Sequence, residues 1–304
     1  MNTEGATLEM EPPHPYVDAL VDQFDSPIED SSQAEDAVRL YRRVLAAQPD
    51  RSVAISSVGL LTNLASLLRS GPDDNSPLDG RALVAQKVRF FLCLSKKPIN
   101  VSVVLLRMSP RQLSSMWCAC QVSLLVAMAG TYPSSGILLS ECNMSGGLPW
   151  PLSNWHNKHV GSRASSYVSE NWPAESKILW SGSEVGLRVV TGGPEFQECE
   201  VATNENPVLV ALVTYMGGPN KGRFSWDPLT TLIAVRGTAA GGCAECDNCD
   251  GANSVNTFTG GNKWILGANS NQSYLVLQDA DVAENAINSL LCQKPLLHPQ
   301  ITSP

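Results

Sequence analysis

The 304-residue sequence contains no apolar run of the roughly 20 residues that a membrane-spanning helix requires. Its longest apolar runs, residues 101–106 and 122–129, have the length of buried strands. The first residues form neither a basic segment nor an apolar core, so the sequence as given predicts no signal peptide. We therefore expect no membrane partner, and the compartment stays open.

Charge is also scarce, and it is unevenly distributed. Charged residues make up 16% of the chain, and the net charge is −8. Residues 1–36 hold ten acidic side chains and no Lys or Arg, so the acidic excess is an N-terminal feature. Nucleic acids and anionic membranes repel such a chain, and we expect neither as a partner. Hydrophobic residues, at 43%, are sufficient for a large core.

Nine cysteines are too few for a disulfide scaffold at this length, and an odd number leaves at least one unpaired. Cys243, Cys246 and Cys249 are spaced three residues apart in a loop rich in Gly, Asp and Asn. Zinc prefers four ligands, and the next cysteine that could complete the set is Cys292. A disulfide or free thiols are therefore favoured over a zinc site.

Short apolar runs that alternate with helical patterns predict a parallel α/β sheet. Residues 34–47 have apolar side chains at helical spacing, residues 53–58 are a β-prone run, and a Gly turn then opens a helical pattern through residue 68. Further strands are predicted at 123–128, 177–180 and 274–278, further helices at 82–88, 163–171, 207–216, 228–235 and 281–292, and a loop at 181–186. The fold class is α/β, a mostly parallel sheet flanked by helices, with ligands expected at the carboxyl ends of the strands.

Two segments interrupt this order, and each is either an insertion or translated non-coding sequence, two alternatives that the sequence leaves open. Residues 89–122 contain several Lys and Arg side chains and no acidic residue, and they separate a helix from the strand that should follow it. Residues 148–161 are rich in Pro, Trp and His, and we expect His156 and His159 there to be surface residues rather than metal ligands. The predicted organisation is a disordered leader over residues 1–15, one domain over 16–292 and a tail over 293–304.

Several motifs follow one another in a fixed order between residues 15 and 292, among them LVAMAGTYP, SECN, WSGSEVG and GRFSWDPLTTLIAVRG. With these motifs the chain resembles the inosine/uridine-preferring nucleoside hydrolase family. The resemblance implies an enzyme that hydrolyses the N-glycosidic bond of a ribonucleoside to ribose and free base, with a bound Ca²⁺. It leaves a homo-oligomer open.

The resemblance also assigns roles to individual residues. Glu141 and Asn143 match a Glu-x-Asn pair that hydrogen-bonds the ribose, and Asp227 matches an Asp that binds both the metal and the ribose. Val58 stands where the family has a backbone carbonyl ligand to Ca²⁺. Trp226 stands where many members have a His that protonates the leaving base; an indole cannot do so near neutral pH, but it can stack on a base.

The local pattern alone supports simpler interpretations of the same residues. Asp227 precedes Pro228 and could serve as a helix N-cap. Glu141 and Asn143 lie in a loop, where solvated polar side chains are common. Glu184, between glycines, is expected to be only a neighbour of the pocket.

The family opens with a strand that carries a DxDxxxDD cluster, the source of most Ca²⁺ ligands and of the Asp that activates water. This sequence contains no such cluster. Asp227 alone supplies one charged ligand, whereas Ca²⁺ prefers about six to eight oxygens. The expected fold is therefore nucleoside-hydrolase-like without the family's first strands, and no catalytic general base is assigned.

Two functions are left open by these expectations. One is a Ca²⁺-dependent nucleoside hydrolase, and the other is a catalytically impaired homologue that binds ribosides or other proteins. A third, a zinc-dependent nucleic-acid module built on the three cysteines, is disfavoured by the acidic charge.

Overall fold

The computed structural model describes residues 15–26, 28, 31–88, 124–136, 140–145, 155–199, 205–268 and 270–293. The predicted insertion at 89–122 lies outside these residues, as do the leader up to residue 14 and the tail from residue 294. None of the helices in the described ranges has the length and apolar character that a membrane crossing demands.

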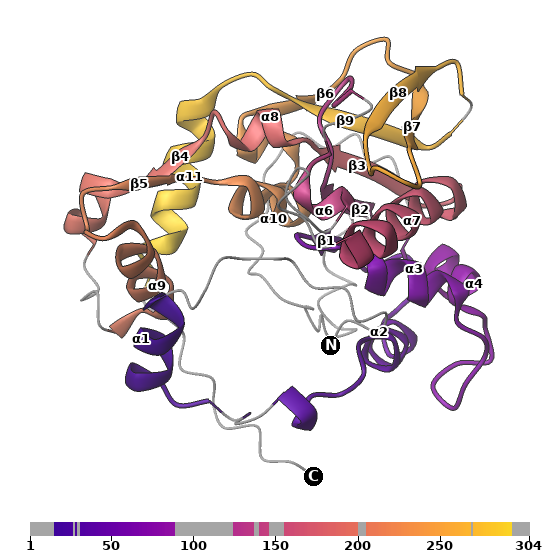
Figure 1. Ribbon diagram of the computed structural model, residues 1–304, viewed down its shortest axis with the longest axis horizontal. Helices are drawn as coiled ribbons and strands as arrows, with labels where there is room; N and C mark the ends of the chain where they lie inside the picture. The colour runs from indigo at the N-terminus through magenta and orange to yellow at the C-terminus, as the bar shows by residue number, and fades with distance from the viewer. Residues whose placement is uncertain are drawn as a thin grey trace, which may run out of the picture.

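A seven-stranded sheet forms the centre of the described structure, with the strand order β1-β2-β3-β9-β7-β8 and with β6 paired to β9 (Figure 1). The parallel strands are β1 (Ile55–Ser57), β2 (Leu124–Met128), β3 (Lys177–Ser181) and β9 (Gln272–Leu277). The antiparallel strands are β6 (Cys243–Glu245), β7 (Gly251–Val255) and β8 (Asn262–Leu266). The predicted α/β class with a mostly parallel sheet is confirmed.

The helices of the described residues lie on both faces of this sheet or pack against one another beside it. They are α1 (Pro15–Gln23), α2 (Ala37–Ala46), α3 (Thr62–Arg69), α4 (Gly80–Lys87), α6 (Cys142–Ser145), α7 (Trp155–Asn171), α8 (Ser183–Gly186), α9 (Pro207–Met216), α10 (Trp226–Arg236) and α11 (Ala280–Leu291). Short 3₁₀ turns are η1 (Ser31–Gln33), η2 (Gly193–Glu198) and η4 (Thr238–Gly241), and β4 (Val190–Gly192) pairs with β5 (Gly222–Phe224) in a small separate sheet.

Alternating side chains of the central strands enter two different cores. Leu125 and Ala127 of β2 pack in a cluster with α3, α4 and α7, whereas Leu124 and Val126 pack in a second cluster with α10 and α11. Figure 1 shows α3 and α7 on one side of the strands and α10 and α11 on the other. This period of two is that of a strand buried on both faces, which explains the continuous apolar run in the sequence.

The helix boundaries differ from the prediction in two places. The helix predicted at 163–171 begins at Trp155, so residues 155–161 of the predicted insertion are the first turns of α7. The predicted loop at 181–186 contains the short helix α8, which begins after Gly182. Helix α9, by contrast, has the predicted bounds, because Asn206 caps it, Pro207 starts it and Gly217 ends it with a positive φ.

The strands β6, β7 and β8 were not predicted. Residues 243–266 are rich in Gly, Asn and Asp, which are depleted in strands and predict turns. Strands β6 and β7 pair with β9, β8 pairs with β7, and α7 packs on β7, so tertiary contacts outweigh a weak local preference.

Candidate functional site

Polar side chains gather where β2 and β3 end. The last residues of these strands, Met128 and Ser181, are partners in the parallel register, so the segments that follow leave the sheet side by side. The two segments are joined to each other, because the backbone N–H of Ser183 donates to the Gly130 carbonyl at 2.8 Å. The hydroxyl groups of Thr131 and Ser183 also lie 2.8 Å apart. The carboxyl edge of the sheet is thus the predicted place for a ligand.

Glu141 is fixed above the segment that follows β2. Its carboxylate accepts backbone N–H bonds from Gly130 at 3.1 Å, from Asn143 at 2.9 Å and from Met144 at 3.3 Å. Burial raises the pKa of Glu141 to about 7; the N–H donors act in the opposite direction, and the Asp227 carboxylate adds to the rise. The side chain is therefore an acid that titrates near neutral pH.

Asp227 lies in the first turn of α10, where a negative charge is favourable. The residue keeps contact with solvent, but the protein atoms that crowd its carboxyl group raise its pKa to about 6, while the Arg223 guanidinium acts to lower it. The N-cap of α10 is Ser225, so the interpretation of Asp227 as the helix cap is wrong. The Asp227 charge makes a small contribution to the raised pKa of Glu141, after burial, which is the main cause.

Glu184 brings a third carboxyl group to the same edge. It accepts the backbone N–H of Tyr132 at 3.2 Å, and burial raises its pKa. The pKa of the buried Tyr132 phenol is raised well above its ordinary value by burial first and then by the charges of Glu184 and Glu141. Glu184 and Glu141 therefore both accept backbone N–H bonds from the same short segment, residues 130–132.

Trp226 is held against α8. Its indole N–H donates to the Ser183 carbonyl at 2.9 Å, and its ring contacts Phe224 edge to face at 5.4 Å. A Cβ at Gly186 would lie 2.3 Å from Cδ1 and 2.6 Å from Cα of Trp226, so only glycine permits this approach. The indole is thus fixed beside Asp227, in a position where an aromatic ring can face a ligand.

Asn143 and Val58 lie at the same edge of the sheet but are placed differently. Asn143 is 6% exposed, and its amide nitrogen donates to the Met128 carbonyl at 2.8 Å, which ties α6 to the end of β2. Val58 directly follows β1, whose Ser57 pairs with Ala127, and its side chain is 38% exposed. Helix α10 packs on both β1 and β2. The five residues singled out in the sequence therefore lie at the end of β1 (Val58), at the end of β2 (Glu141 and Asn143) and at the start of α10 (Trp226 and Asp227).

The residues at this edge do not by themselves form a calcium site. Across the residues that the structure describes, no three His, Cys, Asp or Glu side chains come together as a metal site requires. Ca²⁺ prefers about six to eight oxygen ligands. The two ligands implied by the family resemblance, the Asp227 carboxylate and the Val58 carbonyl, fall far short of that number.

Known proteins resemble this chain in structure rather than in sequence. No protein-family model and no curated protein sequence matches the chain. A plant nucleoside hydrolase superposes on it with a TM-score of 0.54 at 14% identity, covering 94% of this chain and 78% of that one. An inosine-guanosine nucleoside hydrolase gives 0.51 at 14% identity, covering 86% and 69%. The chain has a nucleoside-hydrolase-like fold.

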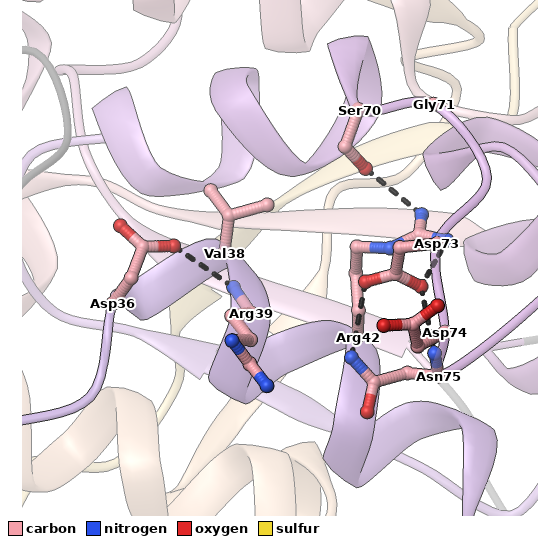
Figure 2. Close-up of a pocket in the computed structure, with 9 residues that line it drawn as sticks. All are labelled: Asp36, Val38, Arg39, Arg42, Ser70, Gly71, Asp73, Asp74 and Asn75. Atoms are coloured by element: carbon pink, nitrogen blue, oxygen red, sulfur yellow. Dashed lines mark hydrogen bonds and ion pairs between the residues drawn. The ribbon is translucent and has the colours of Figure 1, made fainter.

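A surface hollow of about 300 Å³ lies elsewhere on this nucleoside-hydrolase-like fold, between α2 and the segment that joins α3 to α4 (Figure 2). Arg42, which is 2% exposed, donates to Asp73 at 2.9 Å, to Ser70 at 3.0 Å and to two backbone carbonyls. The Arg42 guanidinium and the Asn75 amide hold the pKa of Asp73 well below its ordinary range. The charges of Arg42 and Asp73 are paired with each other. We therefore interpret the hollow as a structural junction between α2 and the segment that joins α3 to α4.

The structure decides between the alternatives for the three closely spaced cysteines and adds a pair that sequence reasoning missed. Cys246 and Cys249 form a disulfide and Cys243 is a buried free thiol, so the zinc alternative is wrong and the disulfide alternative is confirmed. Cys199 and Cys292 form a second disulfide across a sequence separation of 93 residues. No local spacing could indicate that pair, because it depends on how η2 and α11 meet in the fold.

Proposed function

We propose that the chain is a hydrolase that cleaves the N-glycosidic bond of ribonucleosides of the inosine and uridine type at the cluster of Glu141, Glu184 and Asp227. The observation that carries the proposal is the position of Glu141 and Asp227 at the carboxyl edge of a nucleoside-hydrolase-like fold, where burial raises their pKa values to about 7 and about 6. Glycoside hydrolysis commonly uses a pair of carboxyl groups. Their different environments give them different pKa values, so that one acts as an acid and the other as a base or nucleophile.

The chemistry requires that water add to the anomeric carbon of the ribose while the base departs and takes a proton. Asp227 is largely ionised at neutral pH and keeps contact with solvent, so it is suited to accept a proton from the attacking water. Glu141 is partly protonated near pH 7, so it can donate a hydrogen bond or a proton. Such acid–base catalysis typically contributes about 10²–10⁴-fold.

Substrate positioning follows from the neighbouring groups. The hydroxyl groups of Thr131 and Ser183 and the carboxylate of Glu184 offer donors and acceptors for the ribose hydroxyls. The fixed indole of Trp226 offers a face on which a purine or pyrimidine can stack. Hydrogen-bonding groups for the ribose hydroxyls, together with an aromatic ring for the base, suit a nucleoside.

Calcium stays a prediction from the family resemblance, and no step of the mechanism is routed through it. A bound Ca²⁺ would orient the ribose hydroxyls and lower the pKa of water, with Asp227 and the Val58 carbonyl among its ligands. Thermal unfolding in calcium chloride and in magnesium chloride tests this point. Equal midpoints would contradict a calcium site, whereas a rise specific to Ca²⁺ that the Asp227→Asn variant loses would establish one.

The direct test is incubation of the purified full chain with inosine and with uridine. We expect release of ribose and free base, measured by a reducing-sugar assay and by chromatography of the base. Binding is measured in parallel by calorimetry. Absence of both turnover and saturable binding would overturn the proposal.

A second candidate, a riboside-binding homologue without catalysis, is favoured by a different observation. The Glu141 carboxylate already accepts three backbone N–H bonds, and the Asn143 amide already donates to Met128, so both groups have partners within the protein. Saturable nucleoside binding without release of ribose would select this candidate.

A further inference from the structure

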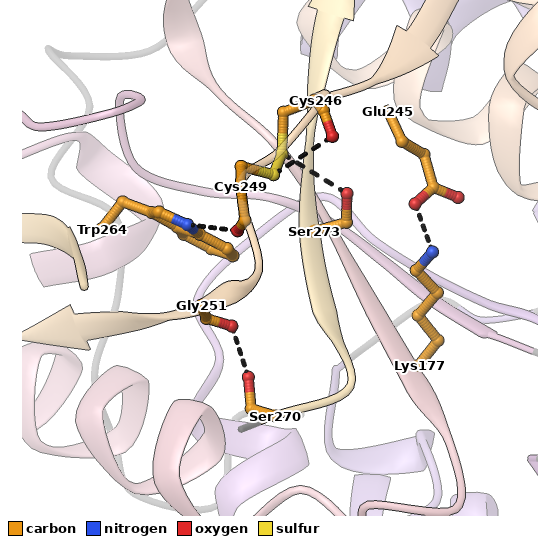
Figure 3. The surroundings of a disulfide bond; sticks show 8 residues. All are labelled: Lys177, Glu245, Cys246, Cys249, Gly251, Trp264, Ser270 and Ser273. Atoms are coloured by element: carbon orange, nitrogen blue, oxygen red, sulfur yellow. Dashed lines mark hydrogen bonds and ion pairs between the residues drawn. A yellow bond between two sulfur atoms is a disulfide. The ribbon is translucent and has the colours of Figure 1, made fainter. Parts of the chain in front are cut away.

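A two-residue loop at one edge of the sheet is closed by the disulfide between Cys246 and Cys249 (Figure 3). The two residues between the cysteines, Asp247 and Asn248, are exposed, and Asn248 has a φ of 53°. Cys246 is half-buried, whereas Cys249 is 8% exposed. A reductant in solution therefore reaches the sulfur of Cys246 first.

This disulfide is poorly placed to stabilise the fold. A cross-link between residues three apart closes a very small loop, so it removes little conformational entropy from the unfolded chain. The other disulfide, Cys199–Cys292, spans 93 residues and joins the end of η2 to the end of α11. The Cys-x-x-Cys spacing is also the one that thiol–disulfide exchange proteins use. A role other than stability is therefore indicated for Cys246 and Cys249.

The protein anchors both flanks of the loop, so that its opening is a local event. Glu245, which precedes Cys246, is ion-paired with Lys177 of β3. On the other side, the Ser270 hydroxyl donates to the Gly251 carbonyl at 2.5 Å. Figure 3 shows these two contacts on either side of the disulfide. Reduction can free residues 246–249 without separating β6 or β7 from the sheet.

The loop contacts a cluster of three aromatic rings that reaches the polar site. The indole N–H of Trp264 donates to the Cys249 carbonyl at 2.8 Å, and the backbone N–H of Cys246 donates to the Tyr274 carbonyl at 2.9 Å. Tyr132 stacks on Tyr274 with ring centroids 5.2 Å apart and meets Trp264 edge to face at 6.0 Å. The backbone N–H of Tyr132 in turn donates to Glu184.

We propose that Cys246 and Cys249 form a reversible redox site for a small dithiol, and that the closed disulfide holds Trp264 and Tyr274 against Tyr132, so that the redox state of the loop sets the order of residues 129–136. The contacts form a continuous path from the sulfur atoms to the Glu184 carboxylate. The proposal does not depend on the proposed hydrolase activity.

The exchange proceeds in two steps. A thiolate of the dithiol attacks the sulfur of Cys246, a mixed disulfide forms, and Cys249 leaves as a thiolate that takes up a proton. The second thiolate of the dithiol then attacks the dithiol sulfur that is bonded to Cys246. Cys246 is released as a thiolate, which also takes up a proton. Two electrons pass to the protein, and the dithiol becomes a cyclic disulfide. The Ser273 hydroxyl, 3.6 Å from the Cys246 sulfur, can donate to the thiolate of Cys246.

The test titrates the full chain with dithiothreitol, followed by thiol alkylation and peptide mapping. We expect Cys246–Cys249 to open at a reductant concentration roughly tenfold or more below that required for Cys199–Cys292. Amide hydrogen exchange of residues 129–136 is measured on the same samples, and we expect it to become several-fold faster after the loop opens. Reoxidation should restore the slow exchange.

Three variants make the result specific. The double variant Cys246→Ser/Cys249→Ser should show fast exchange at residues 129–136 under all conditions, whereas Cys199→Ser/Cys292→Ser should keep the redox response. The variant Trp264→Phe retains a ring but loses the hydrogen bond to Cys249, so its loop should still open while the response of residues 129–136 weakens. Opening of Cys246–Cys249 only together with Cys199–Cys292, or opening without any change in exchange, would overturn the proposal.

Discussion

Burial raises the pKa of Glu141 and the Asp227 carboxylate adds to that rise, although Asp227 lies in the first turn of α10 and Glu141 immediately precedes α6. Helix α10 packs on β1 and β2, and the Glu141 carboxylate accepts a backbone N–H from Gly130, in the segment that follows β2. A site built in this way depends on the order of the strands rather than on any single motif.

Replacement of Asp227 by Asn tests its part in the reaction. If Asp227 accepts the proton of the attacking water, Asp227→Asn should lower turnover of inosine or uridine roughly a hundredfold or more. Asp281→Asn is the matched control, because Asp281 is also an exposed residue in the first turn of its helix. Activity of Asp227→Asn within a few-fold of the parent would remove Asp227 from the mechanism.

Glu141 gives a prediction for stability against pH. Its folded-state pKa of about 7 lies above the ordinary value of 4.5, so the folded protein binds this proton more tightly than the unfolded chain does. The contribution of this proton to the free energy of unfolding is fully present below pH 4.5 and is lost as pH rises through about 7. In urea unfolding, Glu141→Gln should remove this decline in the free energy of unfolding, which amounts to about 3 kcal/mol. The exposed control Glu175→Gln should retain it.

Gly186 should tolerate no side chain, because the added Cβ would meet both the ring and the backbone of Trp226. Overpacking of this kind costs about 1–3 kcal/mol, so Gly186→Ala should unfold at lower denaturant and should bind nucleoside more weakly. Gly71→Ala is the control, since a Cβ there has no atom within 4 Å. Equal stability of the two variants would show that Trp226 can move aside without cost.

Arg42 should be essential to the junction between α2 and the segment before α4. Arg42→Leu leaves two backbone carbonyls and the Asp73 carboxylate without their donor, and we expect a loss of about 3 kcal/mol in chemical denaturation. Because Arg42 lowers the pKa of Asp73, the ion pair stabilises the fold above the ordinary Asp pKa and is lost as pH falls below it. The difference between Arg42→Leu and the parent should therefore shrink in acid, and a constant difference would contradict the ion-pair explanation.

Elements with strong local signals were predicted well. The apolar run 123–128 became β2 almost unchanged, and Asn206, Pro207 and Gly217 defined α9 at both ends. Elements whose stability comes from distant partners were not predicted: β7 and β8 have turn-forming composition, and the first turns of α7 coincide with a Pro- and Trp-rich segment.

The sequence by itself determined the alternation of buried strands with amphipathic helices, and with it the edge of the sheet at which polar residues would gather, because side-chain periodicity sets which faces are buried. Only the tertiary structure decided that the Asp227 charge reaches the buried Glu141 and that Cys246 pairs with Cys249 while Cys199 pairs with Cys292. It also decided that Tyr132 links Glu184 to Trp264 and Tyr274. Such relationships depend on strand order and on the packing between elements, and these place residues together regardless of their separation along the chain.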